Sequence, residues 1–210
     1  MTGRGRPRGF DRENALRRAM ELFWAKGYDG ASLSDLTAAM GINPPSLYAA
    51  FGSKEALFRE AVDLYARSES PEIWRAIESE PTARAAFDAF LRLTALAFSR
   101  PDRPRGCLMV LGALNASDTS AEVCAALREH RAGNAEALRA RLERGVVEGE
   151  LPPGLDCAAL ASFYATVQQG MSIQARDGAT REALLATANG AIAAWPALTA
   201  TQKSTAKSEF

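Results

Sequence analysis

Residues 32–54 read SLSDLTAAMGINPPSLYAAFGSK and carry the signals for two short helices joined by a tight turn. Ser32 is a favoured N-cap residue, and Asp35 follows three positions later, as in a capping box. Gly41 ends this helix, and Asn43 begins the next one with prolines behind it, because proline at the first helical position needs no N–H partner. The pattern predicts a helix-turn-helix.

The segments on either side also have helical periodicity. Asp11 is expected to cap a helix that runs to about Lys26, and Ser53 to cap one that runs to about residue 66. Further helices are predicted at 82–99, 106–116, 119–149, 156–177 and 180–195. No segment alternates as a strand does, so the chain is predicted to be all-α with about nine helices.

This order of elements predicts three parts of the chain. Residues 8–68 are predicted to form a three-helix helix-turn-helix domain with a fourth, linking helix. Residues 69–197 are predicted to form a larger helical domain, and residues 198–210 a polar tail that we expect to be disordered.

The composition argues against several classes of function. The chain has 210 residues with one histidine, His130, and three dispersed cysteines, Cys107, Cys124 and Cys157. Metal sites and nucleophile–base pairs draw on closer sets of such residues, so we expect no enzyme activity, no metal and no cofactor. A redox or metal-sensing role for Cys107 stays open beside the more common reading of a buried small apolar residue.

Nothing in the sequence indicates a membrane segment or a secretory signal. No apolar run approaches the ~20 residues that span a bilayer, and the basic N-terminus has no apolar stretch behind it. We therefore expect a cytoplasmic protein.

The N-terminus is basic although the formal net charge of the whole chain is zero. Arg4, Arg6 and Arg8 stand in the first eight residues without any acid. Such an arm is typical either of a polyanion contact or of a solvated terminus. If it binds DNA, the adjacent minor groove is the expected place.

The stretch from residue 19 to 65 resembles the DNA-binding domain of the TetR family of bacterial transcriptional regulators. The matching residues are Phe23, Gly27, Tyr28, Ser32, Leu36, Gly41, Ile42, Ser46, Leu47, Tyr48, Phe51, Ser53, Lys54, Glu55 and Leu57. The resemblance covers about residues 8–68, and beyond them it extends only to length and helix count. It implies an all-helical homodimer that binds a palindromic operator in double-stranded DNA. It also implies a repressor that a small-molecule inducer releases, with effector binding and dimerisation in residues 69–197.

The resemblance also implies which residues meet the DNA. The expected contacts are Arg4, Arg6, Arg8, Ser32, Ser34, Asn43, Pro45, Ser46, Tyr48, Ala49, Ala50 and Lys54. Tyr48 and Lys54 are expected on phosphates, while Ser32 is equally well explained as a simple N-cap. Ala49 and Ala50 are smaller than the residues common at these positions and offer only apolar contact, for example to a thymine methyl. Specificity is therefore expected to lean on Ser46 and the arginine arm.

For the C-terminal part, the resemblance implies a ligand pocket and a dimer interface. Apolar stripes with a few polar residues indicate where they could lie, although ordinary core explains many of the same positions. The expected pocket residues are Trp74, Phe87, Phe90, Leu91, Phe98, Met109, Asn115, Phe163, Gln168 and Gln169. The expected interface residues are Leu160, Tyr164, Val167, Met171, Leu184, Ala188, Ala191, Ile192 and Trp195.

Two other classes of protein remain as alternatives. A helical enzyme would need a nucleophile–base pair, a glycine-rich phosphate loop or a ligand cluster, and none is visible. A helical adaptor or sensor without a DNA role would not require the basic arm together with Tyr48 and Lys54 beside the short-helix pair.

Overall fold

The structure is a computed structural model that describes residues 10–69, 71–113 and 121–200. Helices are the only regular elements in these described ranges, which confirms the all-α prediction. The DNA-binding end consists of α1 (Arg12–Gly30), α2 (Leu33–Met40), α3 (Pro44–Phe51) and α4 (Lys54–Ser68). The remainder consists of α5 (Pro71–Ser79), α6 (Ala83–Phe98), α7 (Leu108–Leu111), α8 (Ala121–Val147), α9 (Cys157–Arg176), α10 (Arg181–Ala193) and α11 (Trp195–Thr199).

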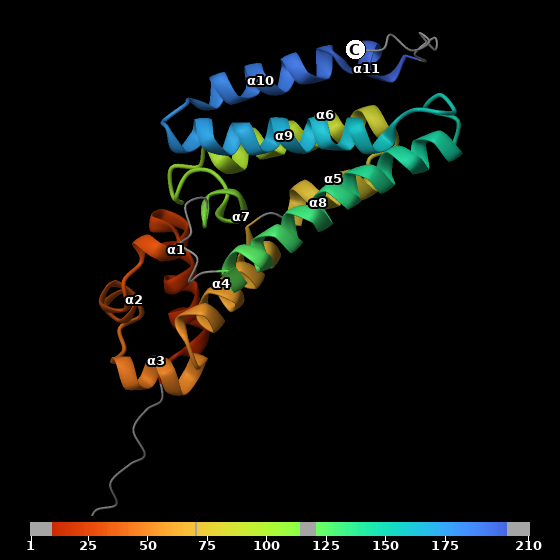
Figure 1. The fold of residues 1–210 in the computed structure, drawn as a ribbon. Helices are drawn as coiled ribbons and strands as arrows, with labels where there is room; N and C mark the ends of the chain where they lie inside the picture. Colours follow the sequence, from red (N-terminus) through yellow and green to blue (C-terminus); the bar gives the residue numbers. More distant parts are fainter. Residues whose placement is uncertain (1–9, 70, 114–120, 201–210) are drawn as a thin grey trace, which may run out of the picture.

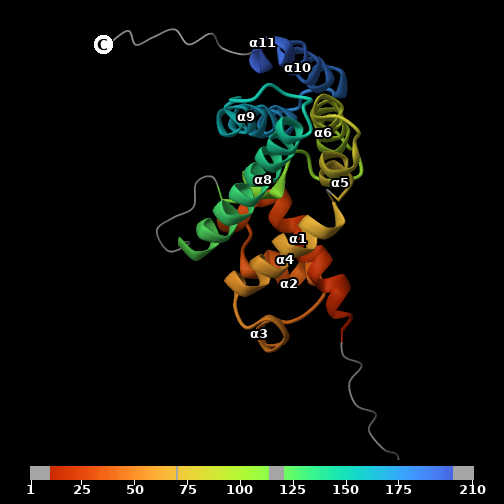
Figure 2. The same ribbon diagram turned by 90° about the vertical axis from the view of Figure 1, so that its right-hand side faces the viewer.

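The two ends of the molecule have separate hydrophobic cores. Figures 1 and 2 place α3 at one end and α10 at the opposite end, with α4 and α8 running between them. Apolar side chains of α1–α4 form the first core, and residues of α7 and α8 complete it, namely Leu108, Met109, Val123 and Leu127. The second core gathers α5, α6, α8, α9 and α10 around buried aromatic rings.

Local signals start and end the helices of the N-terminal domain. Asp11 caps α1 by accepting hydrogen bonds from two first-turn amides, and Ser53 caps α4 by accepting from the Ala56 amide. Gly27 has φ 73° inside the range of α1, so the regular helix breaks there, as the glycine predicts. The Gly27 break lets Tyr28 turn back into the core, where its side chain is buried.

The sequence prediction of the helices was incomplete in the C-terminal domain. It missed α5, which Pro71 begins and which buries Ile73, Ala76 and Ile77. It also missed α11, so residues 198–199 of the expected disordered tail are helical, while 201–210 lie outside the described residues. The helix expected at 106–116 is a single turn, α7, within the described part of that range.

Candidate DNA-binding surface

Side-chain caps fix the geometry of the α2–turn–α3 unit. The Ser32 hydroxyl oxygen accepts from the Asp35 amide at 3.0 Å, and the Asp35 carboxylate accepts from the Ser32 amide at 3.3 Å. Gly41 ends α2 with φ 68°, a left-handed conformation that glycine adopts without strain. The Asn43 side chain then accepts from the Ser46 amide at 2.9 Å and starts α3. The turn between the two helices is therefore set by residues within it.

The side chains of α3 divide into an anchored face and an exposed face. Leu47 and Phe51 are buried against the core. Tyr48 is 47% exposed although it is a large aromatic residue. Pro45 and Ala49 are also exposed, while Ser46 and Ala50 are half-buried. The exposed face is small and apolar around one tyrosine hydroxyl, so it offers apolar contacts together with one hydroxyl that can donate or accept a hydrogen bond.

Lys54 is held at the first position of α4 by an aromatic ring. Its Nζ lies 4.3 Å from the centroid of the Tyr28 ring, a cation–π contact. The Tyr28 hydroxyl donates to the Glu55 carboxylate at 2.6 Å, which lowers the pKa of Glu55. Burial lowers the pKa of Lys54, and the charges of Asp29 and Glu55 oppose this shift. The amine is thus positioned beside a helix N-terminus, where N–H groups also favour an anion.

Several residues expected to contact DNA are exposed in the structure, and others lie outside the described residues. Ser32 and Ser34 are exposed at the start of α2, and Asn43 is exposed before α3. Ser32 is an N-cap, and its hydroxyl proton is still able to donate to a phosphate. The arm arginines Arg4, Arg6 and Arg8, as well as Asn115 of the expected pocket, lie outside the described residues.

Sequence reasoning did not select Arg12, which contacts the end of α3. Its guanidinium carbon lies 4.4 Å from the centroid of the Phe51 ring. Its Nη2 atom donates to the Ala50 carbonyl at 3.2 Å and lies 2.8 Å and 2.9 Å from the two carboxylate oxygens of Glu60. Nothing in the local pattern shows this, because Arg12 and Ala50 are 38 positions apart.

Most residues of the expected ligand pocket are packed core. Phe87, Phe90, Leu91 and Phe98 are at most 3% exposed. The Trp74 and Phe90 ring centroids lie 5.5 Å apart. These side chains pack closely because aromatic residues on α5, α6 and α9 face one another.

Four other members of the expected pocket set lie elsewhere or remain candidates. Met109 belongs to the N-terminal core instead, and Phe163 is 39% exposed in a surface hollow with Leu198. Gln168 is half-buried and donates to the hydroxyl of the fully buried Thr94 at 3.2 Å, between α9 and α6. Gln169 is half-buried beside it.

The expected dimer interface also needs correction. Eight of its nine residues are buried within the single chain, at most 8% exposed, so their side chains stabilise the subunit itself. These are Leu160, Tyr164, Met171, Leu184, Ala188, Ala191, Ile192 and Trp195. Val167 is half-buried. The apolar stripe in the sequence is therefore the inward face of α9 and α10, because the more apolar face of a helix packs against the core.

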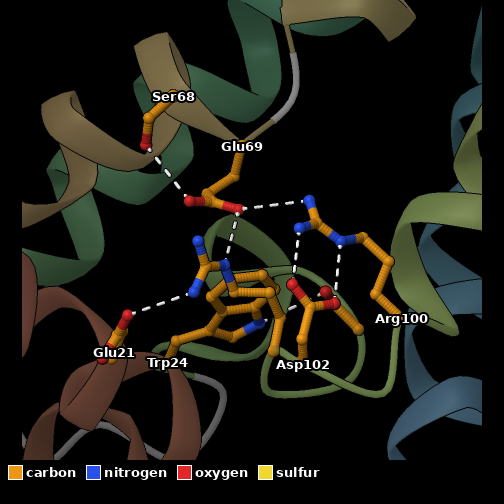
Figure 3. A network of polar contacts seen from close by, with 8 residues as sticks. Glu21, Trp24, Ser68, Glu69, Arg100 and Asp102 are labelled. Carbon is orange, nitrogen blue, oxygen red and sulfur yellow. Dashed lines mark hydrogen bonds and ion pairs between the residues drawn. The ribbon is translucent and has the colours of Figure 1, made fainter.

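A buried carboxylate joins the two domains. Glu69 follows α4 and is 6% exposed in its side chain; Figure 3 shows it between the two domains. Its Oε2 lies 3.4 Å from Arg103 Nε and 3.8 Å from Arg100 Nη1, both on the loop after α6. Arg103 also reaches Glu21 of α1 at 3.4 Å. The loop therefore contacts both α1 and the end of α4.

Hydrogen bonds to main-chain atoms connect the same regions. The Tyr28 amide donates to the Gly112 carbonyl at 2.7 Å. The Trp24 indole N–H donates to the Gly106 carbonyl at 3.2 Å. Arg176 of α9 donates to the Trp24 carbonyl at 3.0 Å. The DNA-binding end is thus fixed to the C-terminal domain at several points of α1.

Cys107 immediately precedes α7 and is a partly buried residue that packs against both hydrophobic cores. Burial raises the pKa of its thiol, which disfavours the reactive thiolate. Within the described ranges no group of three or more His, Cys, Asp or Glu side chains is arranged to hold a metal ion. Among the same residues, no helix is both long enough and apolar enough to cross a membrane.

The structure combines a capped helix pair, whose second helix is exposed, with a second helical domain. This combination is that of a helix-turn-helix DNA-binding regulator. Comparisons with known proteins agree. The family described as bacterial regulatory proteins, tetR family, matches residues 15–61, and the tetracyclin repressor-like C-terminal domain matches residues 81–184. The HTH-type transcriptional repressor ComR of Escherichia coli (strain K12) is 37% identical over 196 residues, 93% of each chain. The repressor BdcR of the same strain is 33% identical over 184 residues, 88% of each chain.

A solved structure shares the fold over almost the whole chain. It is a cysteine mutant of the TetR family transcriptional regulator CifR complexed with 26-bp double-strand operator DNA. The match has a TM-score of 0.88 and 47% identity, and it covers 91% of this chain and 100% of that chain. The protein therefore belongs to the TetR family of bacterial transcriptional regulators, which are not enzymes.

Proposed function

We propose that the protein is a dimeric repressor that binds a palindromic operator through α3 and releases it when a small-molecule inducer binds the C-terminal domain. The observation that carries the DNA role is the exposed face of α3, where Tyr48 projects while Leu47 and Phe51 are anchored beneath it. The relative CifR, seen with operator DNA, supports the same use of this domain. ComR and BdcR are named repressors, which supports repression.

On the DNA, Pro45, Ser46, Ala49 and Ala50 would meet base edges in the major groove, and Tyr48 would bind a phosphate. Lys54 supplies a second phosphate contact, since its amine is already held over the Tyr28 ring. Ser32 and Ser34 add neutral donors at the start of α2.

The test begins with a duplex that the wild-type protein enriches from a random-sequence library. Lys54→Gln should weaken binding to this duplex and lower the salt slope, log Kd against log salt concentration, by about 0.9 for each subunit, or about 1.8 for the dimer. Arg67→Gln removes the same charge from the exposed last turn of α4 and serves as the control. An unchanged slope for Lys54→Gln contradicts the phosphate contact. A reporter with this duplex at its promoter should be silenced, and activation would contradict repression.

We propose that the dimer forms through the outward face of α9 and α10. The stripe consists of Phe163, Thr166, Gly170 and Ile173 on α9, and of Ala183, Ala186, Gly190 and Ala193 on α10. Ile173 is 45% exposed, and small residues around it allow close approach of another helix pair. This stripe replaces the inward-facing residues that the sequence pattern suggested.

Gly190→Arg tests this face. A Cβ at Gly190 would meet nothing within 4 Å in the single chain, so the helix tolerates the substitution while a partner helix would not. Sedimentation velocity should show a monomer with weakened operator binding. Gly133→Arg on α8 is the matched control, because its Cβ is equally unobstructed. A dimeric Gly190→Arg variant contradicts the proposed interface.

The inducer is proposed to enter between α6 and α9 beside the Thr94–Gln168 hydrogen bond. This bond offers polar groups in an otherwise apolar region, the usual character of a small-molecule site. In a thermal-shift screen of small apolar compounds, true hits should release the enriched duplex and should lose their effect with Gln168→Leu. Hits that shift both proteins equally contradict this location.

A further inference from the structure

Arg12 joins three helices at the end of the DNA-reading helix. It starts α1, stacks on Phe51 of α3 at 4.4 Å, and pairs with Glu60 of α4 at 2.8 Å. Its hydrogen bond to the Ala50 carbonyl, 3.2 Å, ends on a residue expected to meet the bases. One side chain therefore fixes this end of α3 against both neighbouring helices.

The last turn of α3 lacks a cation of its own. No basic residue stands there, although the free carbonyls of a helix C-terminus carry partial negative charge and favour one. The helix is eight residues long, and only Leu47 and Phe51 are buried. Arg12 supplies the missing charge from another helix and covers the ring of Phe51.

We propose that Arg12, held by Glu60, is a positioning residue that sets the orientation of α3 for sequence-specific DNA recognition, rather than a phosphate ligand. The Arg12 side chain is 49% exposed and that of Glu60 is 37% exposed, so a phosphate contact is the alternative to be excluded. The inference rests on the DNA-binding function proposed above and goes beyond it by assigning a role to a pair outside the reading surface.

Glu60 separates the two roles because they predict opposite signs. If Arg12 binds a phosphate, Glu60→Gln frees its guanidinium and removes a repelling acid, so DNA binding should strengthen. If Arg12 positions α3, the same change loosens Arg12 and binding to the enriched duplex should weaken, although a negative charge has been lost. The matched control is Glu13→Gln, which removes an acid from the first turn of α1, next to Arg12. The side chain of Glu13 is 80% exposed.

Arg12→Ala gives a second readout, the ratio of affinities for the enriched duplex and for a random-sequence duplex of equal length. A positioning residue should reduce specific binding by about tenfold, given the strength of a charged hydrogen bond and a cation–π contact, and leave non-specific binding nearly unchanged. Loss of a phosphate ligand should weaken both equally and lower the salt slope by about 0.9 for each subunit, or about 1.8 for the dimer. Arg17→Ala, on the same helix, is the charge control.

The experiment measures affinity by fluorescence anisotropy at several salt concentrations for the wild-type protein and the five variants. Arg12→Lys should recover part of the specificity, since it keeps the charge but loses the planar stacking. Urea unfolding of each variant shows whether a loss of DNA binding comes merely from an unfolded protein. The expected result is weaker specific binding by both Arg12→Ala and Glu60→Gln with an unchanged salt slope in folded protein. Tighter binding by Glu60→Gln, a reduced slope for Arg12→Ala, or an unchanged specificity ratio overturns the positioning role. Failure of the wild-type protein to enrich any duplex instead overturns the DNA-binding function.

Discussion

The α2–turn–α3 unit and the aromatic core of the C-terminal domain are held together in different ways. Each helix of the unit is eight residues long, and side-chain caps and one left-handed glycine define it locally. The core is held by rings from distant positions, as where the Phe87 centroid lies 4.9 Å from that of Tyr164 and 5.3 Å from that of Trp195. Consequently the first region is set for contact with DNA, and the second provides most of the free energy of folding of its domain.

The largest effect on stability is expected from truncating a side chain in the aromatic core. Phe87→Ala should lower the free energy of unfolding by about 3–5 kcal/mol, because it removes a fully buried ring and leaves a cavity. Urea denaturation measures the loss. Tyr48→Ala, on the exposed face of α3, is the counterpart and should change stability little while weakening DNA binding. A loss below about 1 kcal/mol for Phe87→Ala would remove the distinction between the regions.

The domain junction should show the next largest effect. Gly106 has φ 80°, and an added Cβ would lie 2.7 Å from the Ser172 carbonyl oxygen. Gly106→Ala should therefore destabilise by more than about 2 kcal/mol, from backbone strain and the clash together. Gly133→Ala, in the interior of α8 with open space around it, is the control and should stabilise by about 0.5–1 kcal/mol. Thermal unfolding of both variants checks the sign of each change.

A local cap in the reading unit should matter less for folding. Asn43→Ala removes the side chain that accepts from the Ser46 amide, so it should cost about 1 kcal/mol. Because α3 begins there, the variant should also bind the enriched duplex more weakly. If stability and DNA binding were both unchanged, the cap would not define the start of α3.

The smallest expected effect is a pH dependence of the capping box. Hydrogen bonds from Lys26 and then from Ser32 lower the pKa of Asp35. Since the folded pKa lies below the unfolded value of about 4, the stabilisation is present above that pH and is lost as the pH falls through the folded pKa. The stability difference between wild-type and Asp35→Asn proteins should shrink under acid denaturation. A difference that grows as the pH falls would contradict this assignment.

The same contrast explains what the sequence predicted. The helix-turn-helix was recognisable because Ser32, Gly41 and Asn43 act within a few residues. No helix is predicted between residues 66 and 82, although Ile73, Ala76 and Ile77 of α5 are all buried and Pro71 stands at the first helical position, where proline is favoured. A proline can begin a helix as well as end one, so the local signal alone does not decide this segment.

Other features could be assigned only from the three-dimensional structure. Tyr164 stands on an apolar stripe, and the stripe alone does not say whether it faces the same chain or a second subunit. Its hydroxyl donates to the Ala191 carbonyl at 3.0 Å, which shows that it faces inward. Arg12 was missed for a similar reason, since its partners on α3 and α4 are distant in sequence.

The bond from the Tyr28 amide to the Gly112 carbonyl has a consequence for sequence divergence. Donor and acceptor both belong to the backbone, so the contact persists whichever side chain follows the glycine at position 27. Where Trp24 and Arg176 contribute side chains to the junction, their acceptors are carbonyls too. Side chains on either side of this junction can therefore change during evolution while the main-chain connection between the two domains is kept.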